Sequence, residues 1–102
     1  MANQQYLYVI TIGHITGNPH EIEIWYVEHE GCYYIVSDKR EKAHWVQNIR
    51  ANPTITVRVG DHTFEGIGSF PEDNALLTAV KSKMDAKYNW SDGLVVQLCR
   101  KP

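Results

Sequence analysis

Four basic side chains gather in the stretch "SDKREKAHWVQNIRANP", residues 37–53. They outnumber its acidic side chains, with Lys39, Arg40, Lys42 and Arg50 against Asp38 and Glu41. The stretch runs into a predicted helix, whose first turn offers free backbone N–H groups and a partial positive charge. Together these groups would hold a phosphate or a carboxylate. The alternative is a solvated, salt-bridged loop, because charged turns are common on protein surfaces.

The turn "GHITGNP", residues 13–19, is a second candidate for anion binding. Its glycines and its threonine hydroxyl could present successive hydrogen-bond donors to an anion. The turn has neither the lysine of a P-loop nor the GxGxxG spacing, and it is predicted between antiparallel strands. An ordinary turn is therefore its alternative role.

Trp25 is predicted on the polar face of its strand, beside Glu21 and Glu23. A ring of this size needs a partner, which could be a second subunit or a flat ligand. The alternative is that both faces of the strand are covered by the chain itself.

Other chemistries find little support in the residue types. The five histidines have neither HxxxH nor HxH spacing, so we expect structural or surface roles rather than metal catalysis. No cysteine or serine has a base beside it in a recognisable nucleophile motif. Cations and aromatic rings without an acid, base or nucleophile set are typical of a protein that takes its chemistry from a cofactor.

Length and composition predict one domain over residues 1–102, with 43% hydrophobic residues and a formal net charge of -2. Such a balance gives no general attraction to nucleic acid or to an anionic membrane. Cys32 and Cys99 lie far apart and no signal peptide is recognisable, so we expect a reduced, cytoplasmic chain. The apolar stretches are the length of strands, which argues against a transmembrane helix.

Periodicity predicts six strands and two helices, a mostly β fold. A short helix carries Trp45 and Ile49 and stops at Pro53, and a second helix begins near a capping box formed by Ser69 and Glu72. Six strands in so short a chain should curl into a small antiparallel barrel. The expected strands cover 6–13, 21–28, 32–37, 54–59, 62–70 and 93–99. Gly66 and Gly68 share one face of their strand and indicate a bend or a close approach.

The stretches "TIGHITGNP", "YYIVSDKREKAHWVQNIRANPTITVRVG" and "VVQLCRKP" resemble the deazaflavin-dependent nitroreductase family. This family falls within the flavin-binding split-barrel superfamily, which is pyridoxamine phosphate oxidase-like. The most specific parts are T-x-G-x-x-[ST]-G-x-P after the first strand and W-x-x-N-[IL]-[RK]-A-N-P at the helix end. Many members have Arg-Lys where this chain has His14-Ile15.

The resemblance implies a six-stranded split β-barrel, usually a homodimer, with coenzyme F-420 or FMN in a groove by the barrel mouth. Basic residues would hold the phosphate of the coenzyme, and aromatic side chains would flank its ring. The expected cofactor-binding residues lie within the matching motifs or close to them. They are Thr16, Gly17, Trp25, Ser37, Lys39, Arg40, Lys42, Trp45 and Asn48.

We therefore expect a flavin- or deazaflavin-dependent oxidoreductase that transfers hydride to or from a small organic acceptor. Its side chains would position the coenzyme, and no residue is assigned a catalytic role. We expect a homodimer without nucleic-acid or membrane partners. The alternatives are a non-catalytic split-barrel dimer that stores, carries or senses a flavin, a deazaflavin or a haem-like ligand, and a structural dimer without a cofactor.

Overall fold

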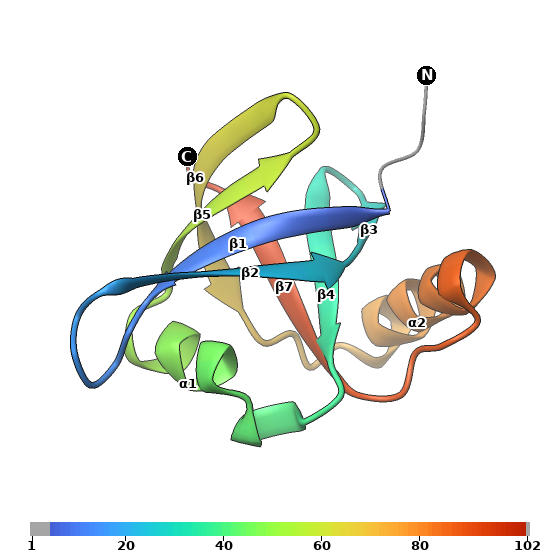
Figure 1. The fold of residues 1–102 in the computed structure, drawn as a ribbon. Helices are drawn as coiled ribbons and strands as arrows, with labels where there is room; N and C mark the ends of the chain where they lie inside the picture. The colour runs from blue at the N-terminus through green and yellow to red at the C-terminus, as the bar shows by residue number, and fades with distance from the viewer. Residues whose placement is uncertain (1–4, 102) are drawn as a thin grey trace.

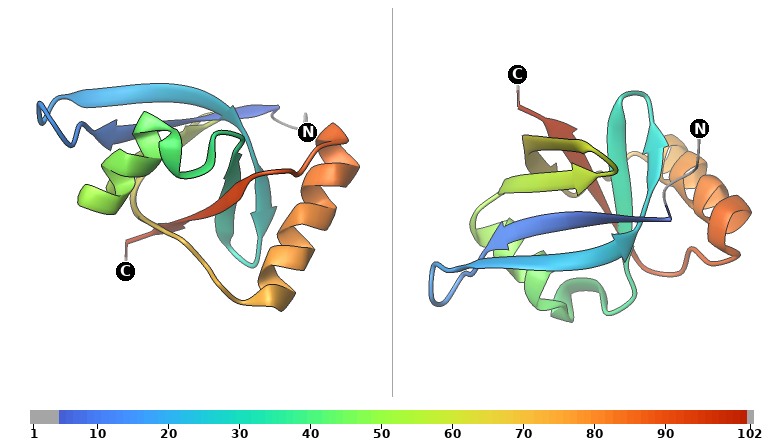
Figure 2. Two further views of the ribbon diagram at one scale, coloured as in Figure 1. Left: turned by 90° about the horizontal axis from the view of Figure 1, so that it is seen from below. Right: turned by 45° about the horizontal axis from the view of Figure 1, so that its top comes forward.

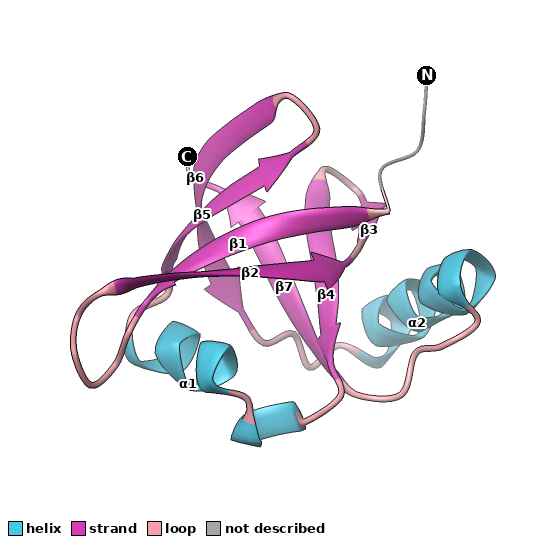
Figure 3. Ribbon diagram, in the orientation of Figure 1, coloured by secondary structure: helices cyan, strands magenta, loops and turns pink. Residues whose placement is uncertain are grey.

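A computed structural model describes residues 5–101 and shows seven strands in one antiparallel sheet (Figure 1). The strand order is β2-β1-β5-β6-β7-β4-β3. The helices are α1 and α2, preceded by a short 3-10 helix, η1 (Figure 3). The elements are β1 (Tyr6–Ile12), β2 (Pro19–Trp25), β3 (Val27–His29), β4 (Cys32–Ser37), η1 (Arg40–Lys42), α1 (His44–Ala51), β5 (Thr54–Val59), β6 (His62–Ser69), α2 (Asn74–Tyr88) and β7 (Leu94–Arg100). The expected mostly β fold with two helices is confirmed.

The two edge strands of the sheet, β2 and β3, follow one another directly in the chain. Tyr26 alone joins them, so the sheet has to curl until its two edges meet, as Figure 2 shows. The expected strand over 21–28 is therefore wrong as a single element, and the sheet has seven strands instead of six. Its first part pairs with β1 and its last part pairs with β4.

The division at Tyr26 has a physical cause at the far end of α2. The Tyr26 N–H donates a hydrogen bond to the Tyr88 hydroxyl at 3.1 Å. The same hydroxyl lies within donating distance of the Tyr26 carbonyl, at 2.8 Å, and of the Gln5 carbonyl, at 2.6 Å. Partial burial raises the pKa of Tyr88, so its phenol keeps the proton that it donates. A side chain thus takes the backbone groups of Tyr26 that would otherwise continue a strand.

Alternation along the strands produces two cores. One fills the barrel, where Leu7, Val9 and Leu98 are fully buried, and Trp45 and Ile49 of α1 pack against it. The other lies between the opposite face of the sheet and α2, which runs beside the β3–β4 hairpin in Figure 2. Ile22, Ile24 and Tyr26 share the barrel face as expected. Within residues 5–101, no helix is long and apolar enough to cross a membrane.

Gly66 and Gly68 allow the close approaches that their spacing indicated. A Cβ on Gly66 would overlap the carbonyl oxygen of Cys99 in the neighbouring strand. A Cβ on Gly68 would lie 2.8 Å from Cγ2 of Ile49, and the Gly68 N–H donates to the Pro53 carbonyl at 2.8 Å. The missing side chain at Gly68 is therefore what lets α1 lie against β6, and the missing side chain at Gly66 makes room for the backbone of β7.

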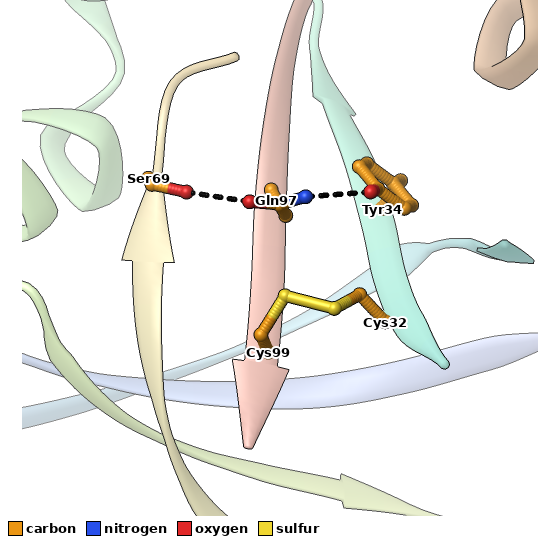
Figure 4. The surroundings of a disulfide bond; sticks show 5 residues. All are labelled: Cys32, Tyr34, Ser69, Gln97 and Cys99. Atoms are coloured by element: carbon orange, nitrogen blue, oxygen red, sulfur yellow. Dashed lines mark hydrogen bonds between the residues drawn. A yellow bond between two sulfur atoms is a disulfide. The ribbon is translucent and has the colours of Figure 1, made fainter. Parts of the chain in front are cut away.

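The start of α2 differs from the expectation. The helix begins at Asn74, and Asp73 takes the N-cap position without a side-chain hydrogen bond. Ser69 belongs to β6 instead, because pairing with β7 continues up to Gln97. Its hydroxyl donates to Gln97 Oε1 at 2.9 Å, and Gln97 Nε2 donates to the Tyr34 hydroxyl at 2.6 Å (Figure 4). The capping box of Ser69 and Glu72 is not formed.

The two cysteines form a disulfide between β4 and β7, which corrects the expectation of a reduced chain (Figure 4). They are 67 positions apart in sequence. The pairing of Tyr33 with Leu98 sets Cys32 directly opposite Cys99, and their Cα atoms are 4.7 Å apart. This spacing is that of directly opposed residues on neighbouring antiparallel strands. Only the register of the sheet brings the two sulfur atoms together.

Candidate functional site

A cavity of about 830 Å³ lies beside the glycine turn that joins β1 to β2. Three parts of the chain line it: this turn, the start of β2, and the segment from residue 38 into α1. Five of the predicted cofactor-binding residues meet here, namely Thr16, Lys39, Lys42, Trp45 and Asn48. The fold therefore brings the basic stretch and the glycine turn, which are separate in sequence, to one site.

The N-terminus of α1 contributes to the electrostatics of this cavity. Ala43, His44 and Trp45, at the start of the helix, are among its lining residues. The first turn contains no acidic residue that would offset the partial positive charge of the helix end. Lys39 and Lys42 precede the helix directly and are exposed. One continuous segment thus presents two ammonium groups and a helix N-terminus to the same space.

Asn48 is buried, with 3% of its surface exposed, and its amide connects α1 to the glycine turn. Its Oδ1 accepts the His14 N–H at 3.0 Å and lies 2.5 Å from His14 Nδ1, while Nδ2 donates to Thr11 Oγ1 at 3.0 Å. Because a backbone N–H can only donate, the amide oxygen must face His14. His14 Nδ1 therefore carries a proton. Asn48 acts by orienting His14, since its amide oxygen and one of its amide N–H groups already bond within the chain.

The glycine turn is held by its own backbone. The Gly17 N–H donates to the Gly13 carbonyl at 2.9 Å, and Gly17 has a φ of 78°. The expected contact between this N–H and a phosphate is therefore not available. Thr16 lines the cavity, and its hydroxyl oxygen accepts the Asn18 N–H at 3.3 Å. The hydroxyl proton of Thr16 can still be donated to a ligand.

Ser37 and Arg40 shape the loop after β4 and do not line the cavity. Ser37 is 1% exposed, and its hydroxyl donates to the Arg40 carbonyl at 3.1 Å. The guanidinium of Arg40 pairs with Asp92 at 2.9 Å, near the start of β7. Ser37 was expected to bind the coenzyme and Arg40 its phosphate, yet the Ser37 hydroxyl and one guanidinium nitrogen of Arg40 bond within the chain.

Trp25 finds its partners within the chain. Its ring stacks on Tyr88 with centroids 4.5 Å apart and an interplanar angle of 6°, and it meets the edge of Trp90 at 6.2 Å. The alternative of a strand covered on both faces is the one that the structure shows for most of this ring. Trp25 lines a second cavity, of about 450 Å³, and not the first one.

Three histidines were missed as candidate site residues. His14, His20 and His44 all line the larger cavity, although they come from the turn, from β2 and from α1. A Cβ on Gly13 would lie 2.9 Å from His20 Nε2, so this glycine makes room for the imidazole. Metal-ligand spacing was the wrong signal to seek, and the position of His14 inside the glycine turn was the available one. Among residues 5–101, no three His, Cys, Asp or Glu side chains are placed to share a metal ion.

Comparison with known proteins identifies the family. A sequence profile described as "F420H(2)-dependent quinone reductase" matches residues 1–91. The chain belongs to this family. Membership in the F420H(2)-dependent quinone reductase family confirms that this protein is a deazaflavin-dependent oxidoreductase, as expected. No curated protein shows a significant match.

Solved structures of the same fold come from several functional groups. The heme storage protein HutZ from Vibrio cholerae has a TM-score of 0.79 at 16% identity, covering 98% of this chain and 84% of that one. A putative pyridoxamine 5'-phosphate oxidase from Listeria innocua has a TM-score of 0.74 at 14% identity, covering 96% of this chain and 85% of that one. An F420-H2 dependent reductase, FDR-A, has a TM-score of 0.69 at 22% identity, covering 96% of both chains. At these identities the likeness shows the split-barrel fold.

Proposed function

We propose that this family member holds the phosphate-bearing end of a deazaflavin coenzyme in the 830 Å³ cavity and serves the reduction of a quinone-like acceptor. The observation that carries the proposal is the convergence of Lys39, Lys42 and the α1 N-terminus on a cavity that Trp45 also lines. A phosphate needs cations and N–H donors, and a flat ring needs an apolar wall.

The formal charges of the lining cancel, because Glu21 and Asp38 oppose Lys39 and Lys42. An anion can therefore bind only where the cations are concentrated. The two lysines and the helix N-terminus belong to the segment 39–45, whereas Glu21 lies on β2. Asp38 also lines the second cavity, so it stands at the border between the two. We place the phosphate beside the segment 39–45.

The remaining lining residues position the coenzyme. Trp45 would flank the ring of the coenzyme, and the Thr16 hydroxyl would donate a hydrogen bond to the phosphate of the coenzyme. His14, oriented by Asn48, occupies a position where the resemblance to the nitroreductase family implies a permanent cation. When bound, the deazaflavin supplies the hydride for the acceptor. The protein contributes binding, orientation and electrostatics.

A titration tests this proposal directly. Purified protein is titrated with coenzyme F-420 and, separately, with FMN, while tryptophan fluorescence and the absorbance of the coenzyme are followed. We expect saturable binding of F-420, loss of much of the quenching in Trp45→Phe, and oxidation of reduced F-420 on addition of a soluble quinone. Tighter binding of FMN than of F-420 would change the identity of the coenzyme that we propose but not the site that binds it. Failure of both coenzymes to saturate would refute the proposal.

We also propose that the protein works as a homodimer. Ile15, at the tip of the glycine turn, is 82% exposed, so a partner subunit could bury its aliphatic side chain. Sedimentation analysis of the wild type and of Ile15→Asp tests this. A monomeric wild type would refute the dimer.

A further inference from the structure

The second cavity, of about 450 Å³, lies where β2 runs beside β4 without pairing to it. Three aromatic rings line it: Tyr6 from β1, Trp25 from β2, and Trp90 from the loop after α2. Glu23 and Asp38 are its charged residues, and none of its lining residues within 5–101 is a lysine, arginine or histidine. Aromatic rings and carboxylates without a cation distinguish it from the larger cavity.

The rings of this cavity are held in place before any ligand arrives. Trp25 stacks on Tyr88 and meets Trp90 edge to face, with an interplanar angle of 67°. Tyr88 is itself fixed by its hydrogen bonds to the backbone of Tyr26. Tyr6 is 41% exposed and forms part of the open rim. A ligand would therefore enter a wall whose ordering has already been achieved by folding.

The carboxylates are available as negative charges. Glu23 accepts a hydrogen bond from the Tyr8 hydroxyl at 2.5 Å. This bond and the charge of Glu23 raise the pKa of Tyr8, so the phenol remains protonated and stays a donor. Asp38 takes part in none of the ion pairs found within residues 5–101, whereas the nearby Arg40 is paired with Asp92. The lining of this cavity consequently carries two carboxylates and, within residues 5–101, no basic side chain.

We propose that this second cavity is an aromatic cage for a flat organic cation, of the class of an N-methylated heteroaromatic ring. Tryptophan and tyrosine faces attract a cation through their quadrupoles, and the two carboxylates add Coulomb attraction. An anionic ring of the same shape meets repulsion from both carboxylates. The cage lies about 10 Å along β2 from the larger cavity, since the lining residues of the two are offset by three positions.

Three ligands of matched shape test the cage: 1-methylquinolinium as the cation, quinoline as the neutral ring at pH 7.5, and 1-naphthoate as the anion. The titrations follow the indole N–H signals by two-dimensional NMR in protein without added coenzyme. The cation should shift Trp25 and Trp90 in a saturable manner and leave Trp45, which lines the other cavity, unchanged. Quinoline should bind about 5-fold more weakly or worse, because it lacks the cation–π attraction. The anion should not saturate.

Two isosteric variants test the charges. Glu23→Gln and Asp38→Asn should each weaken binding of 1-methylquinolinium by about 5-fold and leave quinoline unchanged. Asp61→Asn, in the exposed turn between β5 and β6, is the matched control and should change neither affinity. Tyr6→Leu should also weaken the binding of 1-methylquinolinium.

Equal affinity for the cation and for quinoline would overturn the cage, as would a shift of Trp45 in place of Trp25 and Trp90, or no saturation at all. The unperturbed Trp45 signal and the melting temperature show that each variant is folded. Coenzyme binding is measured through Trp45 in the larger cavity, whereas cation binding is measured through Trp25 and Trp90. The two proposals can therefore fail independently of each other.

Discussion

Removal of both lysines of the larger cavity, in Lys39→Ala/Lys42→Ala, is the sharpest test of where the phosphate binds. Both side chains are exposed, so each contributes about 0.5–1 kcal/mol to the attraction of a phosphate. Their joint loss should cost about 1–2 kcal/mol, which corresponds to a Kd raised by about 5- to 30-fold. Stability should hardly change, because neither ammonium group has a counterion among the described ion pairs of residues 5–101.

The matched control is Lys83→Ala/Lys101→Ala. It removes the same charge from α2 and from the residue that follows β7, at positions that do not line the cavity. Its Kd should change less than about 2-fold, since charges beyond the Debye length of about 8–10 Å are screened. The assay is fluorescence titration with F-420 at low and at high salt, and the wild type should lose more affinity with salt than the cavity variant.

Equal losses in the two double variants would show that the coenzyme senses only the net charge of the protein. No loss in either would mean that the phosphate lies away from the segment 39–45. Both results would refute the placement, and the second would also remove the reason for a basic stretch before α1.

Three further predictions concern the framework of the site. Asn48→Ala should lower the free energy of unfolding by about 1–3 kcal/mol, because it leaves the buried Thr11 hydroxyl oxygen without its donor, and should weaken coenzyme binding; denaturant unfolding and titration check this, and a loss below about 1 kcal/mol would contradict it. Reduction, or Cys32→Ser/Cys99→Ser, should cost about 4 kcal/mol by the loop-entropy relation for a separation of 67; melting with and without reductant measures it, and identical curves would show that the disulfide does not form in solution. Gly68→Ala should cost about 1–3 kcal/mol through its clash with α1, and an unchanged melting temperature would show that α1 can move away.

Local patterns were sufficient for most of the fold. Alternation placed the strands because one face of nearly every strand is buried in the barrel or under α2. Pro53 ended α1 close to the expected residue, since proline restricts the residue before it. Gly66 and Gly68 indicated close approaches because only the lack of a side chain explains two glycines on one strand face.

Features that depend on distant residues could not be predicted in this way. Tyr26 interrupts its strand because Tyr88, 62 positions later, takes its backbone hydrogen bonds. The disulfide needs the register of β4 against β7, which no local pattern encodes. Within the basic stretch, Arg40 turns to Asp92 with a φ of 53°, while Lys39 and Lys42 line the cavity. Residue types pointed to segments that the fold brings together around the larger cavity, and tertiary contacts decided which of their side chains line it.

The place of β7 in the sheet has a consequence for the order of events during synthesis. Among residues 5–101, β7 follows all other strands in sequence, yet it lies between β6 and β4 and pairs the group β2-β1-β5-β6 with the group β4-β3. The Tyr88 hydroxyl that holds Tyr26, and so the seam between the sheet edges, also comes late in the chain. A ribosome-bound fragment that ends before residue 88 therefore has two separate groups of strands and an unfastened seam. The larger cavity, with one wall from β2 and another from α1, depends on a sheet whose two groups of strands are joined only when β7 is inserted between them.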